Sequence, residues 1–394
     1  MLQITSFYFV LLIFLTACRP QTAYVDVTRL MEVTVEVTQP GTTPIIPTPQ
    51  TNTVEVTRMV VATPIPRPAL GSAERPIRLL FPANIPAGVV TARAELLTDY
   101  FGQATGLHYQ VEQPAGYDAM LGELCAAPEE TIAFMSAFAY VLANDLCDVQ
   151  AAETSLRLEL PWQMGMIVAR TDSNIQSIAD LAGKRWAVPT VNSPTTDLYF
   201  QAMFSQNGIE IGQRIIAEGD NNALLAVFNG QADFATAAFT PPLLPNLARK
   251  WVYGQDDPEL WRALGIAPTR HPIGYIIVLG DPEDGGYRIR DARAALFDSE
   301  PEIFSQTEII ALSTPIPNDT VAFGARFPLA LAWQLMELLT QFASLDDCRQ
   351  SICSADFLAW EGLEPTNHVA YEPLQMMIEI LQLPQDQVLE IIGR

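Results

Sequence analysis

Residues 185–236 decide the fold, and they read RWAVPTVNSPTTDLYFQAMFSQNGIEIGQRIIAEGDNNALLAVFNGQADFAT. Short apolar runs typical of strands alternate here with longer runs in which apolar residues recur at helical spacing. The pattern predicts strands over 185–188, 214–218 and 233–236, and helices over 195–206 and 222–228. Asn207-Gly208 stops the first helix and Gly230 lies near the end of the second. This alternation predicts an α/β architecture with largely parallel sheets.

The same alternation begins near Pro76 and extends through the rest of the chain. Strands are expected over 77–81, 108–112 and 131–136, and a helix over 89–101 that Gly102 stops. The roughly 319 residues from 76 to 394 exceed the usual size of one hydrophobic core. We therefore expect two lobes.

The first 17 residues predict a lipoprotein signal peptide. The apolar run from Ile4 to Ala17 is shorter than the roughly 20 residues that a membrane-spanning helix needs, and Leu15-Thr16-Ala17-Cys18 has the form of a lipobox. Cys18 would then be the first mature residue, carry lipid and anchor an extracytoplasmic protein to the membrane. No Lys or Arg precedes the run, so an uncleaved anchor helix is the alternative.

Residues 18–75 differ in composition from all that follows. Pro, Thr and Val dominate, and a Val-x-Val-Thr unit recurs at 25–29, 35–39 and 54–58. The alternating residues could form strands, but prolines at 40, 44, 47, 49, 64, 66 and 68 interrupt a continuous ladder. We therefore expect a semi-extended, disordered tether between the lipid and the folded domain.

Charge composition restricts the partners. The chain has 22 basic and 45 acidic residues, a formal net charge of −23, so nucleic acid is not expected as a partner. Only two of the basic residues are lysines, Lys184 and Lys250. An anion site would therefore rely on arginine, hydroxyls or backbone N–H groups.

Four cysteines remain after Cys18, an even number in an oxidising location. Three pairings are possible, and the most economical joins Cys125 to Cys147 and Cys348 to Cys353. A metal site is not expected, because the chain contains no C-x-x-C motif and its three histidines are scattered.

Four further stretches carry a resemblance to a known family. They are 117–121 with 131–140, SIADLAGKR at 177–185, 222–233, and IPND at 316–319. In this order and spacing they resemble the phosphate/phosphonate-binding (PhnD-like) substrate-binding proteins of ABC importers. The resemblance implies a two-lobed type II periplasmic-binding-protein fold over 76–394, with lobe 1 at 76–166 and 319–394 and lobe 2 at 167–318. Hinge segments are expected at 163–169 and 313–322.

The resemblance also implies ligand-binding residues on both lobes. In lobe 2 the segment 192–196 matches a family loop whose hydroxyls hold the ligand's oxygens, which assigns this role to Ser193, Thr195 and Thr196. Independently, a helix start that follows a Ser/Thr cluster offers free N–H groups to an oxyanion. The alternative is a plain helix N-cap. In lobe 1, Tyr117, Ser136 and Tyr140 would face the same cleft, although Tyr140 could instead belong to the core.

Acidic residues near this predicted site complicate the choice of ligand. Asp197 stands where the family usually has Gly, and its carboxylate would repel a bound dianion. Asp220 stands where the family has His, while Asp319 is retained. Two explanations remain open: a zwitterionic ligand whose amine pairs with Asp220 or Asp319, or a pocket that no longer binds phosphonates.

The expected function is that of a membrane-tethered solute receptor that passes a small oxyanion to an ABC permease. It would be a monomer without a cofactor. A ligand-sensing receptor that signals to a membrane partner, or a binding protein for a sulfonate or a zwitterion, is the alternative. A secreted hydrolase is disfavoured because G-x-S-x-G and H-E-x-x-H are absent. The segment 251–286 is expected to be an insertion, with an added strand at 275–279.

Overall fold

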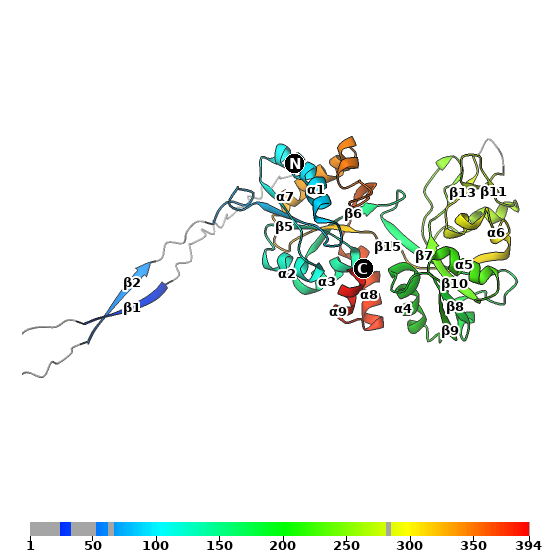
Figure 1. Ribbon diagram of the computed structural model, residues 1–394, viewed down its shortest axis with the longest axis horizontal. Coiled ribbons are helices and arrows are strands. Elements are labelled where there is room, and N and C mark those ends of the chain that lie inside the picture. The colour runs from blue at the N-terminus through cyan, green and yellow to red at the C-terminus, as the bar shows by residue number, and fades with distance from the viewer. Residues whose placement is uncertain (1–23, 33–52, 62–66, 281–284, 394) are drawn as a thin grey trace, which may run out of the picture. The chain divides into compact units, whose positions relative to one another are not determined.

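The computed structural model describes residues 24–32, 53–61, 67–280 and 285–393, and the chain divides into two units, 1–68 and 69–394. In the first unit, β1 (Tyr24–Glu32) and β2 (Thr53–Val61) pair antiparallel with Val27 opposite Arg58 (Figure 1). The expected semi-extended tether 18–75 therefore includes two paired strands. The first and third Val-x-Val-Thr units form the strands because every proline of the segment falls outside them. The middle Val-x-Val-Thr repeat, 35–39, and Cys18 lie outside the described residues.

The second unit contains two six-stranded sheets. The first has the order β17-β6-β16-β5-β3-β4, in which β3 pairs parallel with β4 and β5 while β16 pairs antiparallel with β5 and β6. Its strands are β3 (Ile77–Leu80), β4 (Tyr109–Glu112), β5 (Thr131–Met135), β6 (Gln150–Leu156), β16 (Thr320–Phe323) and β17 (Gly362–Pro365). We call this sheet and the helices that cover it lobe 1 (Figure 1).

The second sheet has the order β14-β7-β10-β8-β9, with β15 paired to one end of β7. Its strands are β7 (Trp162–Arg170), β8 (Arg185–Val188), β9 (Gln213–Ile216), β10 (Phe234–Phe239), β14 (Thr307–Leu312) and β15 (Ile316–Pro317). A small sheet of β11 (Thr269–Arg270), β12 (Ile276–Val278) and β13 (Tyr287–Ile289) is also present. We call this part lobe 2. The predicted strands at 185–188, 214–218 and 233–236 are confirmed within two to three residues at their ends.

Helices flank both large sheets. Lobe 1 carries α1 (Ala87–Thr105), α2 (Tyr117–Ala126), α3 (Ala137–Cys147), α7 (Leu329–Ala343), α8 (Glu372–Leu381), α9 (Gln385–Ile392), and the short turns η7 (Asp346–Gln350) and η8 (His368–Tyr371). Lobe 2 carries α4 (Tyr199–Gln206), α5 (Asp220–Phe228), α6 (Ile303–Gln306), η1 (Ile178–Leu181), η2 (Pro194–Leu198), η3 (Pro245–Leu247), η4 (Leu260–Leu264) and η6 (Ala292–Leu296). No helix in the described part of the chain is long and apolar enough to cross a membrane.

The end of α1 differs from the expectation that Gly102 stops it. The helix continues to Thr105, and Gly106 ends it in the left-handed conformation with φ of 72°. Glycine inside a helix weakens it without ending it, whereas a left-handed position strongly favours glycine.

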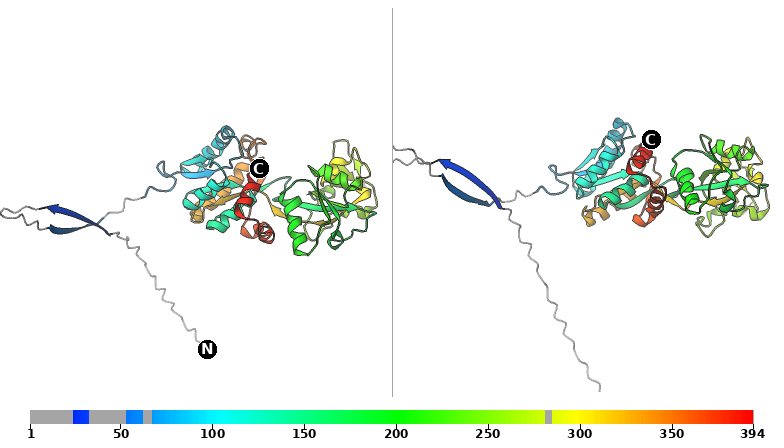
Figure 2. Two further views of the ribbon diagram at one scale, coloured as in Figure 1. Left: turned by 60° about the horizontal axis from the view of Figure 1, so that its bottom comes forward. Right: turned by 90° about the horizontal axis from the view of Figure 1, so that it is seen from below.

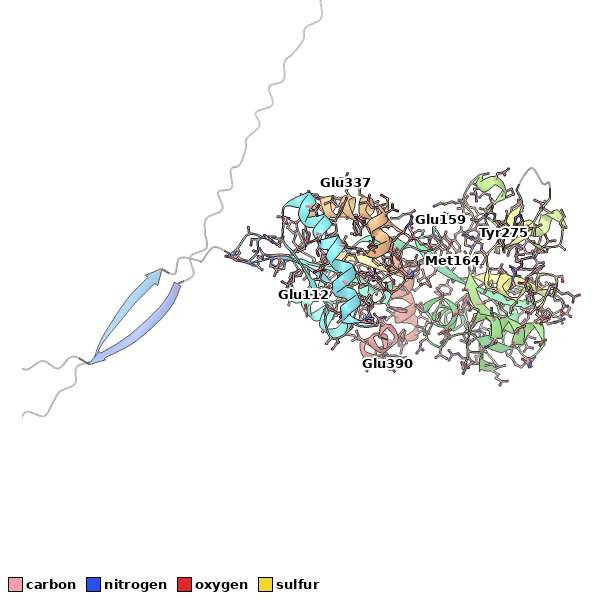
Figure 3. The ribbon with its side chains drawn as sticks, turned by 45° about the horizontal axis from the view of Figure 1, so that its top comes forward. Glu112, Glu159, Met164, Tyr275, Glu337 and Glu390 are labelled. Atoms are coloured by element: carbon pink, nitrogen blue, oxygen red, sulfur yellow. A yellow bond between two sulfur atoms is a disulfide. The ribbon has the colours of Figure 1, made fainter. Side chains whose placement is uncertain are left out.

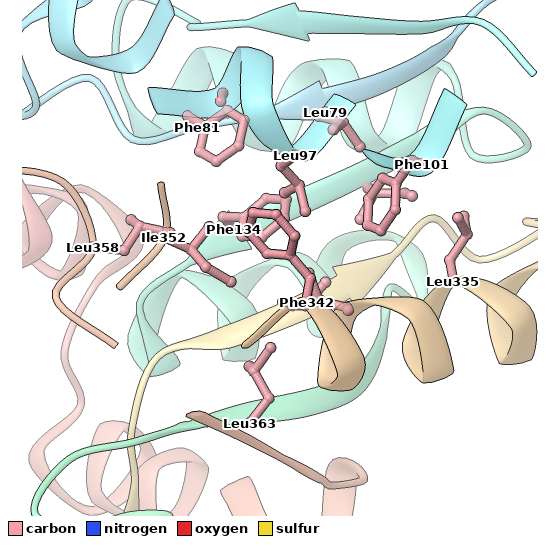
Figure 4. Close-up of a cluster of buried hydrophobic side chains, with 14 of the residues drawn as sticks. Leu79, Phe81, Leu97, Phe101, Phe134, Leu335, Phe342, Ile352, Leu358 and Leu363 are labelled. Carbon is pink, nitrogen blue, oxygen red and sulfur yellow. The ribbon is translucent and has the colours of Figure 1, made fainter. Parts of the chain in front are cut away.

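The core of lobe 1 lies on both faces of its sheet. Along β5, Ile132 and Phe134 point into the cluster under α1 and α7, which Figure 4 shows, while Ala133 and Met135 point into the cluster under α2 and α3. Successive side chains of a strand face opposite sides, so a strand covered on both faces is apolar throughout. This explains why 132–135 is a continuous apolar run.

The chain crosses between the lobes at 157–161 and again at 318–319. The expected outward hinge, 163–169, forms the central strand β7, and its first residue, Gln163, pairs with Ile316 of the other expected hinge segment. Figure 3 labels Glu159 in this crossing and Met164 on β7. Asn318 ties the two crossings together, since its side-chain amide donates to the carbonyls of Ser155 and Leu160, both at 2.9 Å.

A second contact between the lobes is apolar. Helix α8 packs against α4 of lobe 2 and against α3 (Figure 2). Leu374 and Met377 of α8 share one buried cluster with Leu198 and Ala202 of lobe 2. The lobes are thus joined by buried side chains as well as by the two crossings.

Two disulfides lie in lobe 1. Cys125 pairs with Cys147 and Cys348 with Cys353, the economical pairing.

In the segment 251–286, the predicted strand at 275–279 is confirmed as β12. Glu259, which is 7% exposed, pairs with the fully buried Arg293 at 2.8 Å and accepts a hydrogen bond from the Ile309 N–H of β14. The segment is therefore anchored to the second sheet.

Candidate functional site

A cavity of about 560 Å³ lies between the two lobes. Lobe 1 contributes Ser136 to Phe138, and lobe 2 contributes the loop 190–194. The remaining lining residues are Gln163, Ile316, Pro317, Asp319, Leu374, Ile391 and Ile392. One side of the cavity is therefore rich in hydroxyl and amide groups, and the C-terminal helices α8 and α9 make the other side apolar.

A smaller cavity of about 250 Å³ shares Ser136, Asp319 and Ile392 with the first. Tyr117, Arg157 and Trp360 also line it. The shared residues make the two cavities neighbours along one surface of lobe 1. A solute at Ser136 would reach both.

Ser136 lies at the point where β5 ends and α3 begins. Its hydroxyl caps α3 by accepting a hydrogen bond from the Ala139 N–H at 3.3 Å. A helix start that faces a cavity offers N–H groups and the positive end of the helix dipole to an anion. The sequence placed Ser136 at such a start, and the structure shows it lining both cavities.

The lobe 2 loop is held close to the central strand. Ser193 caps η2, accepting from the Thr196 N–H at 3.3 Å, and Asn192 before it has φ of 62°. Gly165 of β7 permits this approach, because a Cβ there would lie 2.1 Å from the Thr195 carbonyl oxygen. Ser193 is therefore a helix N-cap, as the alternative interpretation predicted, and it also lines the larger cavity.

Asp197 does not present a free charge to this cavity. Its side chain is fully buried and forms an ion pair with Arg214, while the Asn192 N–H and the Gln201 amide donate to it at 2.7 Å each. These donors satisfy both carboxylate oxygens. The expected repulsion between Asp197 and a bound dianion is therefore offset by Arg214.

Arg157 and Asp319 form an ion pair at the smaller cavity, 3.0 Å from Arg157 Nη2 to Asp319 Oδ2. Both side chains are partly exposed, at 45% and 35%. Burial raises the pKa of Tyr117 to about 12, and the Asp319 carboxylate adds to this rise while hydrogen bonds with Ser136 oppose it. The phenol is thus neutral near pH 7 and can donate a hydrogen bond.

The structure brings Tyr117, Ser136, Ser193 and Asp319 of the predicted site residues to these cavities. The other four lie elsewhere. Tyr140 is fully buried, with its hydroxyl 3.2 Å from His368 Nδ1 and its ring against Tyr371. Thr195 and Thr196 are 6% and 5% exposed and line neither cavity. Asp220 begins α5, and burial raises the pKa of its carboxyl, which the Ala238 N–H partly offsets.

Sequence reasoning missed Arg157. It directly follows β6 at the start of the first crossing and is one of few cations available in this acidic chain. Its position after a strand end was a signal that could have indicated it, because ligands of α/β folds bind near such ends. Among the described residues no group of three or more His, Cys, Asp or Glu side chains could hold a metal ion.

Comparison with known proteins identifies one family. The family described as ABC transporter, phosphonate, periplasmic substrate-binding protein matches residues 80–371. No curated protein matches the sequence.

Several solved structures are similar in fold. XAC2383 from Xanthomonas citri bound to ATP is 15% identical, covers 79% of this chain and 98% of its own, and has a TM-score of 0.44. PhnD1 from Prochlorococcus marinus in complex with methylphosphonate is 10% identical, with coverages of 78% and 98% and a TM-score of 0.39. A binding protein component of an ABC phosphonate transporter from Pseudomonas aeruginosa is 14% identical, with coverages of 80% and 92% and a TM-score of 0.37.

Proposed function

Because this chain belongs to the family of periplasmic substrate-binding proteins of phosphonate ABC transporters, we propose that it binds a small oxyanion between lobes 1 and 2 and delivers it to a membrane permease. The observation that carries this proposal is the cavity of about 560 Å³ into which Ser136 and Ser193 project from opposite lobes. A ligand that contacts both lobes stabilises the arrangement in which they lie together. We further propose that lipid on Cys18 holds the protein at the membrane.

The ligand oxygens would be bound mainly by neutral donors and one cation. Ser136, Ser193 and the Tyr117 phenol supply hydroxyls, and Arg157 supplies the positive charge. Arginine binds phosphonate or sulfonate oxygens through two parallel N–H groups, which a hydroxyl cannot do. Asp319 could then pair with a ligand amine, so the Arg157–Asp319 pair supports a zwitterion as ligand.

The test is titration calorimetry of the full chain with methylphosphonate, phosphate, 2-aminoethylphosphonate and taurine. A hydrogen bond to a charged ligand group contributes about 1.5–3 kcal/mol, so Arg157→Gln should weaken binding of the best ligand at least about tenfold. Arg326→Gln, which removes an exposed arginine that lines neither cavity, is the matched control and should change nothing. Unchanged affinity in Arg157→Gln, Ser136→Ala and Ser193→Ala together would show that the site lies elsewhere.

The ligand roles predicted for Tyr140, Thr195, Thr196 and Asp220 are tested in the same titrations. Thr196→Val should weaken binding only if the Thr196 hydroxyl contacts the ligand. The helix cap is unaffected by this substitution, because it joins the Thr196 backbone N–H to the Ser193 hydroxyl. Asp220→Asn should weaken binding of a zwitterion and tighten binding of a simple phosphonate. An unchanged affinity in all these variants would confine the site to Tyr117, Ser136, Ser193, Asp319 and Arg157.

A further inference from the structure

Part of the apolar side of the larger cavity comes from the C-terminal end of the chain. Ile391 and Ile392 of α9 line this cavity, and Figure 3 labels the adjacent Glu390 on the same helix. The family match covers residues 80–371, whereas α9 begins at Gln385. This wall is therefore built by a part of the chain outside the family match, so the match does not indicate which group of a solute the wall would contact.

Packing on lobe 1 holds α9 in place. Val388 of this helix is fully buried in the cluster under α2 and α3. Ile391 and Ile392 follow it by three and four residues, so all three share one face of α9. Both isoleucines pack against the edge of the cluster and are only partly buried. A solute in the cavity can therefore contact the part of their surface that remains accessible.

Lobe 2 places an accessible apolar residue at the same cavity. Val191 lies in the loop 190–194 and is 42% exposed. It belongs to none of the buried clusters formed by the described residues of lobe 2. Covering such a residue with a hydrocarbon group removes apolar surface from water, which is favourable. The cavity thus has accessible apolar residues on both lobes.

These apolar residues lie close to the hydroxyl groups that would hold the oxyanion. Val191 and Ser193 are two positions apart on one loop, so their Cα atoms are at most about 7.6 Å apart. In a phosphonate or sulfonate the first carbon is bonded directly to the atom that carries the oxygens. A solute whose oxygens bind at Ser136 and Ser193 therefore has its carbon group within reach of Val191.

The size of the cavity favours a carbon group longer than a methyl group. A water molecule occupies about 30 Å³ in the liquid. Methylphosphonate has five non-hydrogen atoms, and at about this volume for each atom it would fill less than about a third of the cavity of about 560 Å³. Water in the remaining space would keep Val191, Ile391 and Ile392 hydrated. A longer hydrocarbon chain would displace this water and bury their surface.

We propose that the solute carries an alkyl chain of several carbons on its oxyanion, with the oxyanion at Ser136 and Ser193 and the chain between Val191 of lobe 2 and the two isoleucines of α9. This inference rests on the function proposed above, because it assigns a second group of the same solute. Val191, Ile391 and Ile392 then select the alkyl chain, while the hydroxyl groups bind the oxyanion. Phosphonates and sulfonates share this chemistry, and the experiment distinguishes them.

The experiment is titration calorimetry of the full chain with methylphosphonate and butylphosphonate, and with methanesulfonate and butanesulfonate. The pair that binds more tightly identifies the oxyanion. Burying one CH₂ group strengthens binding about fourfold, so the three additional carbons should strengthen it at least about twentyfold. The inference is overturned, with the proposed function intact, if the butyl member binds no more tightly than the methyl member, or if only phosphate, 2-aminoethylphosphonate or taurine binds. If no solute binds, both fail.

Variants then assign the contacts through the ratio of butyl to methyl affinity. Val191→Thr puts a hydroxyl against the chain and should lower this ratio at least about threefold. The double variant Ile391→Ala/Ile392→Ala removes apolar surface and should lower it at least about tenfold. A general loss of stability affects both solutes equally and leaves the ratio unchanged. Val369→Thr, at a 64% exposed valine that lines neither cavity, is the matched control. A wild-type ratio in both the Val191 and the isoleucine variants would overturn the inference.

Discussion

Glu153 should make the protein less stable as the pH rises from about 4.5 to 7, and replacing it should remove this loss. Burial raises the pKa of its carboxyl from 4.5 to about 7 in the folded protein. Between these values the folded protein retains a proton that the unfolded chain has released, so the free energy of unfolding decreases with rising pH. The loss is complete above pH 7 and absent well below pH 4.5.

The size of the effect follows from the pKa difference of roughly 2.5 units, which at 1.36 kcal/mol per unit corresponds to about 3 kcal/mol. Glu153→Gln has no ionisable group there. Its stability relative to wild type should therefore increase by about 2–3 kcal/mol between pH 5 and pH 8. The pH-independent cost or gain of the new amide cancels in this comparison.

Guanidinium denaturation of both proteins at pH 5, 6, 7 and 8 measures this difference. Glu95→Gln, which removes an exposed carboxylate, is the control and should show no pH-dependent difference from wild type. A stability difference between Glu153→Gln and wild type that is the same at all four pH values would refute the assignment of a raised pKa to this residue.

Three further predictions concern other parts of the chain. Arg214→Met should lower the free energy of unfolding by about 2–3 kcal/mol, because it leaves the buried carboxylate of Asp197 without its cation, and Asp197→Asn in the same protein should restore part of the loss in urea denaturation. Replacing Cys125 and Cys147 by alanine, which opens a loop of sequence separation 22, should cost about 3 kcal/mol, and a smaller cost than that of opening Cys348–Cys353 would contradict the loop-entropy account. Cys18→Ser should release the protein from the membrane fraction, and retention at the wild-type level would indicate an uncleaved anchor.

The sequence predicted the alternating elements well where local signals act alone. The helix at 195–206 ends at Asn207 as expected, and the strand at 185–188 is correct at both ends. Local signals did not indicate the elements that depend on a pairing partner. Residues 24–32 form a strand because they pair with 53–61, and 163–169 forms the strand β7 because β10 and β14 flank it.

The sequence indicated that Ser136 and Ser193 would lie close together, but not how the charges near them are paired. Both residues line one cavity, because both begin helices after strand ends. The sequence could not show that Arg214 neutralises Asp197, since the two residues lie 17 positions apart and meet only in the folded chain. Tyr140 shows the opposite limit: an aromatic residue one turn into a helix fits a core and a binding site equally well, and only packing separates them.

The apolar contact between α8 and α4 has a consequence for the kinetics of binding. Leu374 and Met377 share a buried cluster with Leu198 and Ala202. Separating the lobes would expose this surface to water, so wide opening is an activated step with its own barrier. A solute that can enter only during such openings would associate more slowly than diffusion allows, and its observed rate would level off at high concentration. The same barrier would slow release of a bound solute, because the lobes must separate before it can leave.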